Sequence, residues 1–196
     1  MTLTILGIDI GVKGALALIN EAGALLEVWD MPCLNDGPKN RRTVNAPLLA
    51  EIIYKSHATI AVVERVGPRP GEGSVGAFAF GDAKGVVRGV LAAAAIPGDY
   101  LTPAQWKRAV GLPPGKEGAK DRSRSEAIRR WPLRAETFKR KLDDGRAESA
   151  LIAIAGLRLG FLHGLREVSR DDDGAGLALP GVLGGPGELL RRRTVQ

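Results

Sequence analysis

The stretch TILGIDIGVKGALALIN, residues 4–20, decides the fold of this chain. Its apolar, β-branched run over Thr4–Asp9 predicts a buried strand, a glycine-containing turn follows, and Ala15–Asn20 predicts a second strand. A hairpin turn then leads into a third predicted strand over Leu25–Met31. This pattern predicts an antiparallel β-meander whose first strand ends on a carboxylate, Asp9.

The rest of the chain alternates helical and strand patterns. The expected elements are, in order, a polar loop over 36–42 that contains a Gly-Pro pair, a helix over 46–56, a strand over 59–63, a Gly-rich helix over 74–95, a short strand over 99–101, and helices over 103–110, 121–131 and 143–165. This order predicts one α/β domain with a mixed sheet, spanning residues 1–165. Residues 166–196 lack periodicity, and we expect a disordered tail there.

The composition is that of an ordinary globular protein, with 44% hydrophobic and 26% charged residues. No run of about 18 apolar residues is present, so we expect no transmembrane helix and no membrane partner. The first residues also lack the basic region of a signal peptide. The single cysteine, Cys33, excludes an internal disulfide and fits a reducing compartment, so we expect a cytoplasmic protein.

Positive charge is concentrated in one segment. Residues 103–141 carry 12 Lys or Arg against 4 Asp or Glu, whereas residues 1–102 carry 9 against 10. The net charge of +6 therefore comes from this basic segment. Such a localised excess is typical of a protein that binds a phosphate backbone, although a solvated helix face is the simpler alternative.

Four carboxylates occupy positions from which the fold can bring them together. Asp9 and Glu64 each end a predicted buried strand, and Asp144 and Glu148 stand four residues apart at the start of a predicted helix, on one helix face. Buried or crowded carboxylates are unfavourable unless they are compensated, so the pattern indicates bound cations. Carboxylate oxygens suit Mg²⁺, and two His with one Cys give little support for zinc.

Each carboxylate also has a simpler interpretation. Asp9 can cap the turn that follows it, and Glu64 can form an ion pair at a strand end. Asp144 can be a helix N-cap, although Asp143 is the better candidate for that role, and Glu148 can be a solvated helix residue. Together the four favour phosphodiester hydrolysis, in which two Mg²⁺ ions about 3.5–4 Å apart activate a water and relieve charge on the leaving oxygen.

The motifs, in this order, resemble those of the RuvC-type Holliday-junction resolvases, in the variant form common in phage-like members. The similar stretches are Gly7-Ile8-Asp9-Ile10-Gly11, Val63-Glu64-Arg65-Val66, Gly81-Asp82-Ala83-Lys84-Gly85 and Asp144–Ala155. The resemblance covers residues 3–165 and implies a ribonuclease-H-like fold with a five-stranded mixed sheet flanked by helices. It further implies a homodimer that nicks four-way DNA junctions symmetrically, in the cytoplasm, as a nucleoid-associated or phage-encoded protein.

The resemblance also assigns roles to particular residues. It implies that Asp9, Glu64, Asp144 and Glu148 are catalytic and hold two Mg²⁺ ions, for which Mn²⁺ can substitute. It implies basic DNA-binding residues near the scissile phosphate, and the candidates are Lys107, Lys120, Arg122 and Arg124. Each of these basic residues can instead be an ordinary solvated side chain.

The chain departs from the family pattern in two places. The usual final helix carries two Asp three residues apart, which leaves open whether Asp143 or Asp144 is the ligand here. The aromatic residue that commonly follows the second acid, and can stack on a base, is replaced by Gly-Pro. Phe78 or Phe80 can substitute for it, although core positions are the simpler interpretation for both, as for Trp106.

Two further alternatives concern function and assembly. A different ribonuclease-H-like nuclease, acting on branched DNA or RNA–DNA hybrids, and a non-catalytic junction-binding module remain open; a sugar-kinase-like ATPase is disfavoured because a second Gly-rich phosphate loop is missing from the sequence. In the Gly-rich helix, Gly81, Gly85 and Gly89 fall on one face. We expect that face either to form a dimer interface or to pack closely on the sheet.

Overall fold

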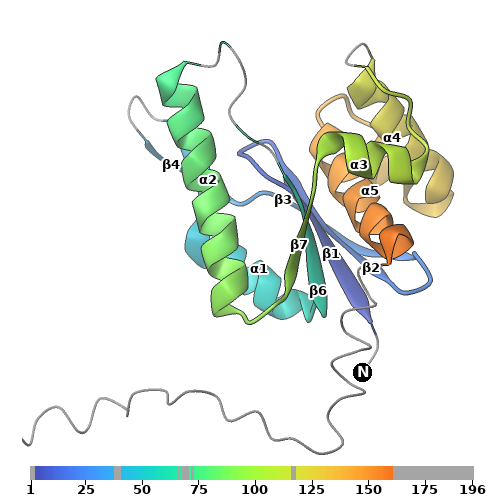
Figure 1. The fold of residues 1–196 in the computed structure, drawn as a ribbon, viewed down its shortest axis with the longest axis horizontal. Helices are drawn as coiled ribbons and strands as arrows, with labels where there is room; N and C mark the ends of the chain where they lie inside the picture. Colours follow the sequence, from blue (N-terminus) through green and yellow to red (C-terminus); the bar gives the residue numbers. More distant parts are fainter. Residues whose placement is uncertain are drawn as a thin grey trace, which may run out of the picture. The chain divides into compact units, whose positions relative to one another are not determined.

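The computed structural model describes residues 3–37, 41–65, 67, 71, 73–115 and 118–160. At its centre lies a five-stranded sheet in the order β3-β2-β1-β6-β7 (Figure 1). Its strands are β1 (Thr4–Asp9), β2 (Ala15–Asn20), β3 (Leu25–Asp30), β6 (Ile60–Glu64) and β7 (Gly98–Leu101). The first three form the antiparallel meander, while β6 is parallel to both β1 and β7. The expected five-stranded mixed sheet is therefore confirmed.

Helices cover both faces of this sheet, as Figure 1 shows. They are α1 (Ala46–Ser56), α2 (Ser74–Ala93), α3 (Pro103–Val110), α4 (Ala119–Arg130) and α5 (Asp144–Leu159), with a 3-10 helix η1 over Pro132–Phe138. The expected end of the last helix at 165 and the expected tail over 166–196 lie outside the described residues. Within the described ranges no helix is long and apolar enough to cross a membrane.

Strand alternation assigns each side chain of β1 to one of the two faces. Leu6 and Ile8 join the core beneath α1 and α2. Gly7 faces the opposite way, because a Cβ placed there would lie 2.0 Å from the backbone oxygen of Ser149 in α5. Asp9, two residues further along, therefore points to the α5 face as well.

Glycines, which have no side chain, allow α5 to lie directly on the sheet. Besides Gly7, the contact depends on Gly156, where a Cβ would lie 2.4 Å from Cγ2 of Val62 in β6. Gly145, at the start of α5, leaves equally little room, since a Cβ there would lie 2.5 Å from the backbone oxygen of Lys13. These contacts hold the first turn of α5 close to the ends of β1 and β6.

One expected element is wrong. Within the predicted polar loop over 36–42, the described residues 36–37 and 41–42 belong instead to two short strands, β4 (Cys33–Gly37) and β5 (Arg41–Val44), which pair as a separate antiparallel sheet. The Gly-Pro pair signalled a break in regular structure, but it could not reveal that the flanking residues pair with each other. The side chains of Thr43 and Asp36 are hydrogen-bonded across this pair of strands.

Candidate functional site

The ends of two parallel strands bring the first two carboxylates together. Ile8 of β1 pairs with Val63 of β6, so the residues that follow, Asp9 and Glu64, end adjacent strands at the same edge of the sheet. Both lie on the face that α5 covers, and Glu64 is 9% exposed. The first turns of α5 add Asp144 and Glu148 beside them.

The four carboxylates influence one another electrostatically. Burial raises the pKa of Asp9 well above its ordinary value, and the negative charges of Glu64, Glu148 and Asp144 raise it further, while Lys120 opposes them. Burial and the charge of Glu64 likewise raise the pKa of Glu148. The cluster therefore carries more negative charge than its surroundings compensate.

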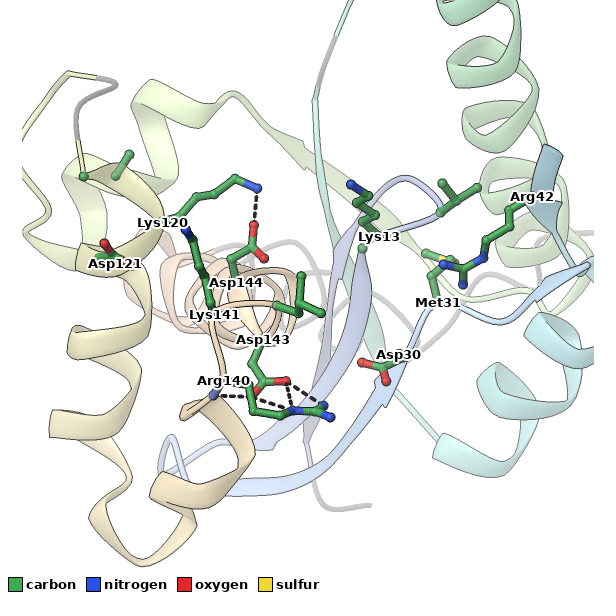
Figure 2. A pocket seen from close by; sticks show the side chains of 15 residues that line it. Lys13, Asp30, Met31, Arg42, Lys120, Asp121, Arg140, Lys141, Asp143 and Asp144 are labelled. Atoms are coloured by element: carbon green, nitrogen blue, oxygen red, sulfur yellow. Dashed lines mark hydrogen bonds and ion pairs between the residues drawn. The ribbon is translucent and has the colours of Figure 1, made fainter.

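The two adjacent aspartates at the start of α5 have different surroundings (Figure 2). Asp143 is 1% exposed, and its carboxylate accepts hydrogen bonds from the backbone N of Arg140 at 2.7 Å and from its Nη2 at 2.8 Å. Burial opposes the charge of Asp143, but the contacts with Arg140 outweigh it and lower the pKa. Asp144 instead forms an ion pair with Lys120. The geometry therefore favours Asp144 as the ligand, which stays a prediction.

The expected capping role of Asp143 is only partly correct. It occupies the N-cap position of α5, but its side chain makes no capping hydrogen bond. The reason is that its carboxylate forms ion pairs with Arg140 and, at 3.7 Å, with Arg146. These cations lie on either side of it along the chain and attract the carboxylate more strongly than a neutral amide does.

A tryptophan holds the Glu64 carboxylate. Trp106 of α3 is fully buried, as expected, and its indole Nε1 donates a hydrogen bond to Oε1 of Glu64 at 2.8 Å. The next residue, Lys107, places its Nζ 5.1 Å from the centre of the indole ring. The sequence indicated a core position for Trp106 but contained no signal for this contact, because it joins residues 42 positions apart.

The structure brings two of the four predicted DNA-binding residues to the carboxylates. Lys120 contacts Asp144, which raises the pKa of the lysine, and the charge of Lys107 acts on Glu148. Arg122 donates a hydrogen bond to the backbone oxygen of Gly115 at 3.0 Å. The Arg124 side chain is 17% exposed and is paired with a carboxylate of its own helix, so its role in DNA binding stays a prediction that this packing does not favour.

The two phenylalanines of α2 differ from the expected core pair. Phe80 is partly buried and packs against the core. Phe78 is 79% exposed, so the core interpretation is wrong for it. Apolar residues occur on all sides of this helix in the sequence, so their spacing could not identify the buried face.

The glycine face of α2 does not pack on the sheet. A Cβ at Gly81, Gly85 or Gly89 would meet nothing within 4 Å. The core of α2 is formed by other residues, among them Val87 and Leu91. Close packing of the glycines on the sheet is therefore wrong, and this face of α2 is open.

The donor atoms suit a hard divalent cation. Four carboxylates supply only oxygen ligands, which Mg²⁺ and Mn²⁺ prefer, and the raised pKa of Asp9 reflects charge that a cation would compensate. As the side chains stand in the described residues, no three His, Cys, Asp or Glu form a ready group of metal ligands. Lys120 occupies an oxygen of Asp144, so ligation requires this ion pair to open.

Comparison with known proteins supports the fold. Neither a family model nor a curated protein matches the chain. A solved structure of Thermus thermophilus RuvC in complex with Holliday junction substrate is similar, with a TM-score of 0.55 and 16% identity over 82% of this chain and 96% of that one. A second T. thermophilus RuvC structure gives a TM-score of 0.54 and 17% identity over 82% and 97%. The described domain has a RuvC-like fold of the ribonuclease-H type.

Proposed function

We propose that this protein is a divalent-metal-dependent endonuclease that resolves four-way DNA junctions by paired nicks. The observation that carries the proposal is the convergence of Asp9, Glu64, Asp144 and Glu148 at one edge of a RuvC-like sheet. Several carboxylates coupled in this way are what a site for two metal ions needs, because each ion requires oxygen ligands and the ions' charges compensate the cluster.

The four carboxylates would hold Mg²⁺ or Mn²⁺, which would activate a water and stabilise the charge on the leaving oxygen. The other side chains position this centre. Trp106 orients Glu64, and the Ser123 hydroxyl lies 3.3 Å from Oε1 of Glu148 and donates to it. Lys120, once displaced from Asp144, is available to bind a phosphate oxygen at the same place.

Paired nicking requires two active sites, and we propose a homodimer. A four-way junction has two-fold symmetry, and a C2 dimer presents two identical sites with the same symmetry. The open face of α2 supports this assembly, because Gly81, Gly85 and Gly89 leave room for a second helix to approach. The exposed Phe78 and Val75 add apolar surface at the start of the same helix.

The decisive experiment is a cleavage assay with three substrates: a four-way junction, an RNA–DNA hybrid and a linear duplex. We expect cutting of the junction at symmetric positions on opposing strands in Mg²⁺ or Mn²⁺, and none with chelator. Preference for the hybrid or the duplex would indicate a different nuclease of the same fold. Binding of the junction without any cutting in either metal would indicate a non-catalytic module, and full cutting in chelator would exclude the metal mechanism.

A further inference from the structure

A cavity of about 610 Å³ lies beside the carboxylate cluster. It reaches Asp144 but none of the other three carboxylates. Its walls come from the β1–β2 turn, the end of β3, strand β5, the start of α4 and the segment that precedes α5 (Figure 2). The mechanism proposed above uses only one edge of it, so the cavity is available for another part of a ligand.

The acidic groups of this cavity are all neutralised by partners. The ion pairs are Asp30 with Arg146, Asp121 with Arg124, Asp143 with Arg140, and Asp144 with Lys120. A carboxylate that already has an arginine or lysine partner contributes little net charge to a ligand nearby. The charge of the cavity is therefore decided by whatever cations remain.

Among the described residues that line the cavity, three cations remain, and they come from three different parts of the chain. Lys13 lies in the β1–β2 turn, Arg42 lies in β5, and Lys141 lies just before α5. Within the part of the chain that the structure describes, no side chain of the three forms a hydrogen bond or an ion pair, although the charge of Arg42 acts on Asp30. In Figure 2, Lys13 and Arg42 lie on one side of the cavity, and Lys141 lies with Lys120 on the other.

We propose that this cavity binds a backbone phosphate of the DNA strand next to the phosphate that is cut. The inference rests on the proposed function and adds a named site to it. Asp144, Lys13 and Lys141 line the same cavity, so a strand bound at Asp144 would have its next phosphate within this cavity. Three unpaired cations around one opening match a phosphodiester, which carries a single delocalised negative charge.

The same cations offset a repulsion that the cluster creates. Four carboxylates at one edge of the sheet repel a polyanionic strand. Neighbouring phosphates feel this repulsion in addition to the scissile one. Lys13, Arg42 and Lys141 compensate it at the position where the next phosphate lies, which lets the strand approach the metal centre.

The first test measures counterion release. Lys13→Gln, Arg42→Gln and Lys141→Gln are compared with Lys55→Gln, a matched control on the exposed surface of α1. Affinity for a four-way junction is measured by fluorescence anisotropy in chelator, where no cutting is expected, over a range of salt. Because the three cations share one phosphate, each variant should lower the slope of log K against log [salt] by no more than about 0.9 and weaken binding by up to roughly tenfold, whereas the control should match the wild type.

The second test locates the phosphate. A neutral methylphosphonate is placed at each backbone position around the cleavage site of the junction. At one position the wild type should lose the same several-fold affinity that Arg42→Gln loses, and Arg42→Gln should show no further loss there, which is the signature of a direct contact in a double-mutant cycle. Circular dichroism checks that each variant is folded.

The outcomes separate this inference from the proposed function. If the wild type cuts junctions but the three cavity variants keep the full salt slope, or no position couples to Arg42, the phosphate site is wrong and the nuclease assignment stands. If the wild type neither binds nor cuts any junction, the proposed function fails and this inference fails with it.

Discussion

Asp9 shows at the scale of a single residue how function opposes stability. Its pKa is raised well above the ordinary value by burial and by three neighbouring carboxylates. The folded state therefore holds the Asp9 proton more tightly than the unfolded state does. In the absence of metal, the contribution of Asp9 to stability is therefore greatest below the unfolded pKa of about 3.9 and is lost as pH rises from there through the raised pKa.

The first prediction follows from the destabilising effect of a charged Asp9 at neutral pH. Asp9→Asn should be more stable than the wild type at neutral pH in chelator, by roughly 2–4 °C in melting temperature for each kcal/mol recovered. It should also abolish cleavage. Thermal melts between pH 4 and 8 measure the first effect, with Asp82→Asn on the exposed surface of α2 as the control. A lower melting temperature for Asp9→Asn at neutral pH would contradict the electrostatic account.

The second prediction separates the adjacent aspartates. Asp144→Asn should remove Mn²⁺ binding and cutting and leave stability nearly unchanged. Asp143→Asn should still bind Mn²⁺ and cut, but its free energy of unfolding should fall by about 1–2 kcal/mol because it loses charged hydrogen bonds to Arg140. The loss is modest because Arg140 is itself exposed to solvent. Since the pKa of Asp143 is lowered, this stability is present above the unfolded pKa and disappears as pH falls through the folded value.

Metal titration and thermal melts of the two variants check this assignment. An inactive Asp143→Asn together with an active Asp144→Asn would mean that the ligand has been placed on the wrong residue.

The third prediction concerns Trp106 as a positioning residue. Trp106→Phe removes the donor to Glu64 Oε1 but preserves most of the buried ring. Partners of metal ligands typically contribute 10- to 100-fold to metal affinity, so we expect a Mn²⁺ affinity lowered by roughly that factor in a folded protein. Calorimetric titration measures it, with Trp29→Phe as the control for loss of an indole elsewhere. Unchanged Mn²⁺ affinity would reduce Trp106 to a packing residue.

At the scale of elements, the site depends on how closely α5 lies on β1. The approach is possible because Gly7 has no side chain where Ser149 needs the space. The carboxylates on β1 and α5 can share a cation only while the backbone of α5 stays in contact with the backbone of β1. Packing between two backbones therefore sets the geometry of the site, although no catalytic side chain takes part in it.

The fourth prediction tests this contact. Gly7→Ala should cost about 3 kcal/mol, because its Cβ would meet backbone and α5 would have to shift. It should weaken Mn²⁺ binding as well, even though every ligand is present. Gly98→Ala is the matched control: in strand β7 a Cβ would lie 3.7 Å from Cδ1 of Leu91, an ordinary van der Waals contact, so the same change should alter stability by less than about 1 kcal/mol. Equal effects of the two substitutions on stability would contradict the packing argument.

At the scale of the whole molecule, resolution of a junction depends on assembly. The open glycine face of α2 and the exposed Phe78 form the surface that we assign to a second copy. The fifth prediction is that Gly85→Leu gives a folded monomer that nicks a junction once, because the new side chain prevents close approach of two helices. Light scattering at micromolar concentration, with and without junction DNA, measures the change.

The control is Lys55→Gln, a substitution on the exposed surface of α1. A glycine such as Gly71 would not serve, because its φ is positive and a leucine there would strain the backbone. A wild type that stays monomeric on junction DNA would contradict the dimer.

The order of the motifs was enough to predict most of the fold. Runs such as Thr4–Asp9 alternate between two buried faces, so each strand is recognisable locally, and a parallel crossover places the ends of its strands at one edge. This is why the adjacency of Asp9 and Glu64 followed from the sequence, as did the start of α5, which was expected at residue 143 and lies at Asp144. The hairpin of β4 and β5 did not, because pairing between short polar strands depends on partners rather than on composition.

By itself the sequence determined the sheet, its helices and the residues with the chemistry for metal binding, since local periodicity and strand order contain that information. Only the tertiary structure decided which neighbours these residues have. It assigned Arg140 to Asp143, Lys120 to Asp144 and the Trp106 indole to Glu64. Hydrogen bonds and ion pairs extend over a few ångströms in space, and the packing of α3, α4 and α5 on the sheet, which no local pattern encodes, determines which groups come within that range.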